Sequence, residues 1–303
     1  MILTNLEQLL DIVRSQVRRH RLAVVMAAEG HVLEAVARAK REGLADPLLF
    51  GNREEIPRLL EELGESVDGW EIRDVREPLE AAVQAVAAVK AGDADVLMKG
   101  SLQTGEFLSA VIDKEKGLLE NGRILSLLSI NEIPGYHKLL LATDAGIVRS
   151  PNLEQKAGIV RNAVEVLASY GYERPKVAAL CAVETVNPKM PETEDAAALA
   201  KMGSAGELGN CVVEGPISMD IALDAERARI KEFQSEVSGD PDILLWPNVL
   251  TGNITMKALG RFTGLKGLSF AVGARVPLVV TSRGTSVDAK YRAILGALSI
   301  CRE

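Results

Sequence analysis

Short, almost wholly apolar runs alternate along this chain with longer segments whose apolar residues recur at helical spacing. Residues 22–28, 177–183 and 243–246 are runs of the first kind, and residues 77–91 and 153–167 are segments of the second kind. Continuous apolar strands separated by amphipathic helices are typical of parallel sheets that helices cover on both faces. The alternation therefore predicts an α/β fold built from doubly wound, mainly parallel sheets.

The length of 303 residues predicts two domains, because one domain takes about 150 residues. No Pro/Gly/Ser-rich linker separates them, so we expect two closely packed domains with the ligand site in the cleft between them. Ser150 is expected to cap the helix that begins at Pro151, and a last helix is expected over residues 286–301.

The charge and composition exclude several function classes. The net charge is −7 and aromatic residues make up 4%, which argues against nucleic acid as a partner. No apolar run approaches the about 20 residues that a membrane span needs, and the N-terminus lacks a signal-peptide core. The three cysteines are far apart in the sequence and form no CxxC pair. These features predict a cytoplasmic protein without a membrane partner.

Polar motifs that directly follow predicted strands are the main candidate site residues, because ligands of parallel α/β sheets bind beyond the carboxyl ends of strands. The first motif, MKGSLQTG, carries Lys99, Gly100, Ser101 and Thr104 in a turn that opens a helix. Free N–H groups at such a turn suit a phosphate, and Lys99 adds a positive charge. An ordinary turn with a solvated lysine is the alternative.

Two further motifs follow strands in the second half of the chain. Asp144 could orient a cation or a substrate hydroxyl, or could bond only to its own turn. The segment PNVLTGNITMK carries four candidates for substrate binding, namely Asn248, Gly252, Asn253 and Lys257. The alternative is that Asn248 and Thr251 only cap a helix.

The segment TSRGTSVD joins a near-wholly apolar strand to the last helix. Arg283 offers a bidentate fork for a phosphate, and Ser282 and Thr285 offer hydroxyl groups. Asp288 is the nearest acid, although an acid at the second position of a helix also complements the helix dipole. Asp220, in EGPISMD, is a further substrate-binding candidate, and with Asp224 it could hold Mg²⁺ or lie on a solvated helix face.

Together these motifs resemble the phosphate acetyltransferase and butyryltransferase family. The resemblance runs over nearly the whole chain, in the family's order and spacing: MKGSLQTGEF, INEIPGYHKLLLATDAGI followed by LEQKAGIVRNAVEVL, EGPISMD, GDPDILLWPNVLTGNITMKAL and GARVPLVVTSRGTS. The MKG turn, the IPGYHKLLLATDAGI segment and the compact length are more similar to the butyryl branch than to the acetyl branch.

The resemblance implies the reversible reaction of butyryl-CoA and phosphate to butyryl phosphate and CoA. It implies a fold of the isocitrate and isopropylmalate dehydrogenase-like group, with residues 1–134 plus 276–303 in one domain, residues 135–275 in the other, and the active site in the interdomain cleft. It also implies a homodimer or larger homo-oligomer, with coenzyme A and phosphate as substrates, no tightly bound cofactor and no metal.

Ser282 and Arg283 match the catalytic signature of the family. The acetyl branch has an acid one position after Asp288, where this chain has Ala289, and an arginine after the loop that matches residues 100–105, for which Lys99 is the substitute. We therefore predict Ser282, Arg283, Asn253 and Asp288 as catalytic residues. Ser282 and Asn253 would donate hydrogen bonds to the oxyanion, and Arg283 and Lys99 would bind phosphate.

Two alternatives stay open at this point. One is a metal-dependent 2-hydroxy-acid dehydrogenase-like enzyme, which would need an aspartate cluster around a divalent ion. The other is a non-catalytic module that binds CoA or acyl phosphate and has lost its base.

Overall fold

The computed structural model describes residues 2–301 and divides by contacts into two compact units. The first unit, which we call the β1 unit, consists of Glu7–Arg123 and residues 268–301. The second, which we call the β6 unit, consists of residues 2–6 and Ile124–Gly267. The predicted boundaries lie at residues 134/135 and 275/276, later in the chain than these. Residues 126–132 join the β6 unit because they pair with its strand Leu140–Thr143, and Leu268 and Phe270 pack on Gly296 in the β1 unit.

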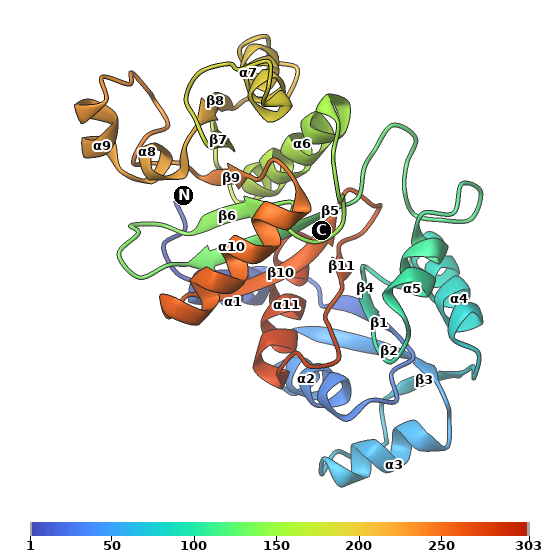
Figure 1. Cartoon of the computed structure of the whole chain (residues 1–303). Coiled ribbons are helices and arrows are strands. Elements are labelled where there is room, and N and C mark those ends of the chain that lie inside the picture. The colour runs from blue at the N-terminus through green and yellow to red at the C-terminus, as the bar shows by residue number, and fades with distance from the viewer. Residues whose placement is uncertain (1, 302–303) are drawn as a thin grey trace. The chain divides into compact units, whose positions relative to one another are not determined.

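The β1 unit is built on strands that are parallel except at one end (Figure 1). Among the described strands of this unit, β10 and β11 pair antiparallel. The order is β3 (Glu71–Asp74), β2 (Ala45–Gly51), β1 (His20–Val25), β4 (Val96–Lys99), β11 (Leu278–Val279) and β10 (Lys266–Val272).

Two groups of helices pack on these strands. One group, α1 (Glu7–Ser15), α2 (Gly30–Arg41) and α11 (Val287–Ser299), packs together, and α4 (Pro78–Ala91) packs with α5 (Thr104–Val111) on the other side of the strands in Figure 1. The short helix α3 (Glu55–Glu62) connects β2 to β3. Helices on both sides of buried strands confirm the predicted α/β class.

The β6 unit repeats this arrangement. Its strand order is β5 (Ser126–Glu132), β6 (Leu140–Thr143), β9 (Ile243–Leu245), β7 (Lys176–Leu180) and β8 (Val212–Ile217), and only β5 is antiparallel to its neighbour. The helices are α6 (Leu153–Ser169), α7 (Pro191–Ser204), α8 (Met219–Leu223), α9 (Ala225–Ile230) and α10 (Val249–Phe262). No helix among residues 2–301 has the length and apolar character that crossing a membrane requires.

The start of α6 differs from the prediction. Asn152, not Ser150, caps this helix, because the Asn152 side chain accepts a hydrogen bond from the Gln155 amide and Gln155 reaches back to the amide of Asn152. This reciprocal pair satisfies two N–H groups that a cap at Ser150 would leave exposed. Pro151 therefore precedes the helix.

A network of ion pairs ties the amino ends of β6, β7 and β9 together. The Lys138 ammonium, 3% exposed, lies 2.7 Å from Asp240 and 2.5 Å from Asp242. Asp240 also accepts from Lys176 at 2.7 Å and contacts His137 at 2.8 Å. Burial alone would raise the pKa of Asp240, but the hydrogen bonds from Lys138, Lys176 and His137 outweigh it and hold that pKa well below its usual range.

We expect the substitution Asp240→Asn to lower the free energy of unfolding at pH 7. The Asp240 side chain is 42% exposed, so solvent screening limits the loss to about 1 kcal/mol. Because folding lowers the pKa, the stabilisation is complete above the unfolded value of about 3.9 and is lost as the pH falls below it. Urea unfolding at pH 7 and pH 3 measures this difference.

Glu236→Gln is the control, because Glu236 forms a more exposed pair with Arg174. It should change stability by less than about 0.5 kcal/mol at either pH. A loss for Asp240→Asn that is equal at pH 7 and pH 3 would contradict the electrostatic explanation.

Candidate active site

The turns that follow β1, β4 and β11 lie side by side, because these strands are parallel neighbours. The Gly100 amide donates to the Val25 carbonyl and the Ser101 amide to the Met26 carbonyl, each at 2.8 Å. A Cβ at Gly100 would lie 2.2 Å from the Met26 oxygen, so only glycine fits this close approach. The strand order thus brings the first and last predicted motifs to one edge of the β1 unit.

Lys99 is the last residue of β4 and is 4% exposed. Its ammonium donates to the carbonyl oxygens of Gly100 at 3.1 Å and Leu102 at 3.0 Å. The alternative of a solvated turn lysine is therefore wrong. Both bonds go to neutral carbonyl groups, so the positive charge itself is left uncompensated.

Lys290 is a second buried lysine at this edge, and we did not predict it from the sequence. It lies in α11, is 1% exposed, and donates from Nζ to the Ser282 carbonyl at 2.8 Å. Its position on the buried stripe of α11, four residues before Ile294 and seven before Ala297, was the available signal. A lysine in an otherwise apolar stripe is seldom buried without a role or a partner.

The charges around Lys99 are unusually one-sided. Burial lowers the pKa of Lys99, and the positive charges of Lys290 and Arg283 lower it further, while Glu29 acts in the opposite direction. Burial also lowers the pKa of Lys290, again opposed by Glu29. Among residues 2–301, no carboxylate oxygen lies within 4.0 Å of any of these three cations.

Arg283 sits in the exposed turn between β11 and α11. Within this turn the Thr285 amide donates to the Ser282 carbonyl at 3.2 Å, and the Ser282 and Thr285 hydroxyls lie 2.9 Å apart. The Arg283 guanidinium makes no hydrogen bond or ion pair with any described residue. Two buried ammonium groups and this unengaged guanidinium form a site that suits a multiply charged anion. We call Lys99, Lys290 and Arg283 the cation cluster.

Asp288 and Thr104 occupy the starts of helices near this cluster. The Asp288 side chain is 70% exposed and pairs with Arg38 of α2 at 3.0 Å. It therefore serves a helix-to-helix contact, and its role as a base has no support from its contacts. Thr104 is the first residue of α5 and is exposed after the capping residue Gln103.

In the β6 unit, Asp144 holds the loop after β6. It is 2% exposed, and its two oxygens accept from the amides of Gly146 at 2.8 Å, Ile147 at 3.0 Å and Val148 at 2.9 Å. Burial raises the pKa of Asp144 in spite of these bonds. These contacts match the alternative interpretation, in which Asp144 bonds to its own turn.

The loop after β9 and the start of α10 contact this Asp144 loop. The side-chain amide of Asn253 donates from Nδ2 to the Ala145 carbonyl at 3.1 Å. A Cβ at Gly252 would lie 2.6 Å from Cδ1 of Trp246. Asn248 caps α10 by accepting from the Thr251 amide at 3.0 Å. The structure thus brings Asp144, Gly252 and Asn253 together within this unit.

Lys257 and Asp220 lie apart from these contacts. Lys257 is on the exposed surface of α10. Asp220 accepts from the Ser218 hydroxyl at 2.7 Å, and Asp224 caps α9. Both carboxylates also pair with Arg227, at 3.8 Å and 3.3 Å. No group of three or more His, Cys, Asp or Glu side chains among residues 2–301 is placed to hold a metal ion.

Comparison with known proteins decides the family. The family model described as phosphate acetyl/butaryl transferase matches residues 65–298, most of the chain. The chain belongs to the phosphate acetyltransferase and butyryltransferase family. The resemblance predicted from the motifs is confirmed.

Curated relatives of both branches are similar to this phosphate acyltransferase family member. The phosphate acetyltransferase of Thermotoga maritima is 40% identical over 291 residues, covering 95% of this chain and 97% of that protein. The phosphate butyryltransferase of Clostridium acetobutylicum is 42% identical over 274 residues, covering 90% of this chain and 91% of that protein. Identity alone therefore does not separate the two branches.

Solved structures share the fold. A branched-chain phosphotransacylase from Enterococcus faecalis superposes with a TM-score of 0.80 at 29% identity, covering 93% of this chain and 98% of that chain. A putative 4-hydroxythreonine-4-phosphate dehydrogenase from Salmonella typhimurium has a TM-score of 0.60 at 11% identity, covering 94% and 100% of the two chains. The second likeness concerns the fold alone.

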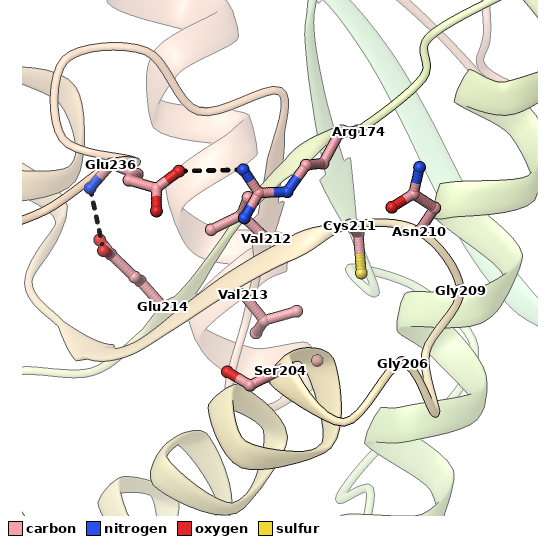
Figure 2. Close-up of a pocket in the computed structure, with 11 residues that line it drawn as sticks. Arg174, Ser204, Gly206, Gly209, Asn210, Cys211, Val212, Val213, Glu214 and Glu236 are labelled. Atoms are coloured by element: carbon pink, nitrogen blue, oxygen red, sulfur yellow. Dashed lines mark hydrogen bonds and ion pairs between the residues drawn. The ribbon is translucent and has the colours of Figure 1, made fainter.

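A cavity of about 660 Å³ in this family member lies away from the candidate residues, at the amino ends of β7 and β8 (Figure 2). Arg174 and Glu236 form an ion pair of 3.1 Å at its rim, and the Glu236 amide donates to Glu214 at 3.0 Å. None of the predicted site residues is among the residues that line it. The candidate residues follow the opposite, carboxyl ends of the strands.

The cysteines are not placed as nucleophiles. Burial raises the pKa of Cys181 to about 11 and that of Cys301 to about 12, and it also raises the pKa of Cys211. Because the thiolate is the reactive form, the raised pKa values disfavour a nucleophilic role for these three thiols.

The uncompensated charge at Lys99 leads to a stability prediction. In phosphate-free buffer, Lys99→Met should raise the free energy of unfolding by about 1 kcal/mol, because an apolar side chain of similar length replaces an unpaired buried ammonium. Lys114→Met, at an exposed lysine, should change it by less than about 0.5 kcal/mol. Urea unfolding measures both, and a clear loss of stability in Lys99→Met would show that the ammonium is compensated in the free protein.

Proposed function

We propose that this protein transfers a short-chain acyl group between coenzyme A and inorganic phosphate, with butyryl as the preferred acyl group. The observation that carries the proposal is the cation cluster, which consists of two buried ammonium groups and an unengaged guanidinium. No carboxylate oxygen of the described residues lies within 4.0 Å of any of these three groups. Phosphate is a dianion near neutral pH and suits such a site. Membership of the family supports the same reaction class.

Different residues would act on the phosphate and on the thioester. In the direction of acyl phosphate, a phosphate oxygen attacks the thioester carbonyl carbon, a C–O bond forms, the C–S bond breaks, and the CoA thiolate leaves and takes up a proton. Lys99 and Arg283 would hold the phosphate. Ser282 and the second amide hydrogen of Asn253 would donate to the carbonyl oxygen as it becomes negative.

The proposal assigns no carboxylate base. In the reverse direction the CoA thiol, with an ordinary pKa of about 8.5, must lose its proton, and nearby positive charge favours the thiolate. The cation cluster can supply this effect. Asn253 belongs to the β6 unit and the cation cluster to the β1 unit, so the joint action of both units on one substrate is part of the proposal.

The acyl chain needs an apolar surface beside Asn253. Leu250 and Ile254 flank Asn253 on α10 and are 66% and 59% exposed, so both are available to a short chain. Leu102 and Phe107 are at most 3% exposed and already belong to the core. Each additional buried CH₂ group contributes about 0.8 kcal/mol, which favours butyryl over acetyl where such contacts form.

Several finer points are also part of the proposal. We infer a cytoplasmic protein that forms a homodimer or larger homo-oligomer, has no tightly bound cofactor, and belongs to the isocitrate and isopropylmalate dehydrogenase-like fold group. The residue ranges 1–134 plus 276–303 and 135–275 stay predictions for its domains, with the site in their cleft. The dehydrogenase alternative draws support from fold likeness alone.

A panel of CoA esters tests the function. With saturating phosphate, free thiol release should occur with acetyl-, propionyl- and butyryl-CoA, and kcat/KM should be about 10-fold or more higher for butyryl than for acetyl. An acetyl optimum would contradict the butyryl preference and leave acyl transfer intact. Binding of CoA without turnover of any ester would favour the non-catalytic alternative, and NAD-dependent oxidation of a hydroxy acid would favour the dehydrogenase.

Arg283→Ala should lower kcat/KM for phosphate by about 100-fold or more, because a charge-assisted contact made in the transition state contributes about 2–4 kcal/mol. Arg283→Lys should restore only part of the activity, since an ammonium lacks the guanidinium fork. Initial rates at varied phosphate measure both variants, with Arg275→Ala, at an exposed arginine, as the control. Near-normal kcat/KM in folded Arg283→Ala would contradict the assignment.

A further inference from the structure

Lys290 occupies a position where the fold calls for an apolar side chain. It is 1% exposed on the face of α11 that carries Ile294 and Ala297, and it is one of the largest fully buried side chains of the described residues. An ammonium group in such surroundings is unfavourable unless its contacts compensate for lost water. The role of Lys290 therefore depends on the hydrogen-bond partner of its Nζ atom.

The contact of Lys290 Nζ is the main-chain oxygen of Ser282, at 2.8 Å. The same oxygen accepts from the Thr285 amide at 3.2 Å. Two donors, one from α11 and one from within the turn, thus bond to one carbonyl oxygen, and the Thr285 hydroxyl lies 2.9 Å from the Ser282 hydroxyl. Without Lys290, the exposed turn would be anchored at this carbonyl only by its own residue Thr285.

Fixing this carbonyl fixes the two side chains on either side of it along the chain. The peptide plane of Ser282 and Arg283 sets the directions in which the Ser282 hydroxyl and the Arg283 guanidinium leave the backbone. Small misplacements of such groups from productive geometry lower rates by about 100-fold. We propose that Lys290 is a positioning residue that holds the Ser282–Arg283 turn in the geometry required for acyl transfer, a role that rests on the proposed function of this turn.

Two variants and a matched control test this role. Lys290→Met keeps the length and removes the donor, and Lys290→Arg keeps a donor. Ser299→Ala removes another buried side-chain donor of α11, whose hydroxyl bonds the Gly296 carbonyl at 2.8 Å, far from the turn. The readouts are kcat and KM for phosphate with butyryl-CoA, and hydrogen exchange at the amides of residues 282–289.

In Lys290→Met we expect kcat/KM for phosphate to fall about 100-fold, because Ser282 and Arg283 both leave their productive positions, and exchange at the Thr285 amide to speed up about 10-fold or more. Lys290→Arg should recover part of kcat/KM. Ser299→Ala should lower the melting temperature without changing kcat or exchange in the turn. If Lys290→Met does not fold, Lys290→Gln, whose side chain is shorter, replaces it.

A folded Lys290→Met with kcat/KM for phosphate within twofold of the wild type would overturn the proposal. A fall in kcat/KM for phosphate with unchanged exchange in residues 282–289 would also overturn it, because Lys290 would then act on the anion directly. If the wild-type protein transfers no acyl group, the proposed function fails, and the exchange measurement still decides for Lys290: unchanged exchange in residues 282–289 overturns its positioning role.

Discussion

The burial of positive charge without a matching carboxylate is the constraint on which the candidate site depends. Lys99 and Lys290 are almost fully buried, and their ammonium groups bond only to main-chain carbonyl oxygens among the described residues. A protein interior does not tolerate such charges without cost, and the usual remedy is an acidic partner. In the proposed function, this positive charge binds an anionic ligand. Glu29, the acid that acts on both lysines, is used to cap α2 through the amides of His31 and Val32.

The parallel topology creates this arrangement from segments far apart in the sequence. β1, β4 and β11 are neighbours in the strand order, so the turns after residues 25, 99 and 279 meet at one edge. Gly100 allows the β4 turn to lie directly against the backbone of Met26. Lys290 then connects α11 back to the turn that precedes it. Strand pairing, one glycine and one long side chain together position the cluster.

Much of this could be predicted from the sequence, because apolar runs mark strands and polar motifs after them mark strand ends. Lys99 and the Ser282–Arg283 turn were predicted in this way. Lys290 was missed because only polar residues in the turns that follow strands were considered, and Asp288 was the last residue weighed in the final helix. For Asp144 the sequence left two roles open, since a carboxylate after a strand can face either a ligand or its own loop. In the structure it accepts hydrogen bonds from three backbone amides of its own loop. The position of Pro151 did not predict the cap of α6, because the cap is set by the reciprocal side-chain bonds of Asn152 and Gln155.

The central claim is that Lys99, buried without a carboxylate partner, binds phosphate, and thermal unfolding in the presence of phosphate tests it most directly. A ligand that binds only the folded protein stabilises it by an amount that rises with the logarithm of the ligand concentration above Kd. At constant ionic strength, replacing chloride by phosphate should raise the melting temperature of the wild-type protein, and the rise should be largely absent in Lys99→Met. An equal rise in both proteins, or none in the wild type up to tens of millimolar phosphate, would contradict the account.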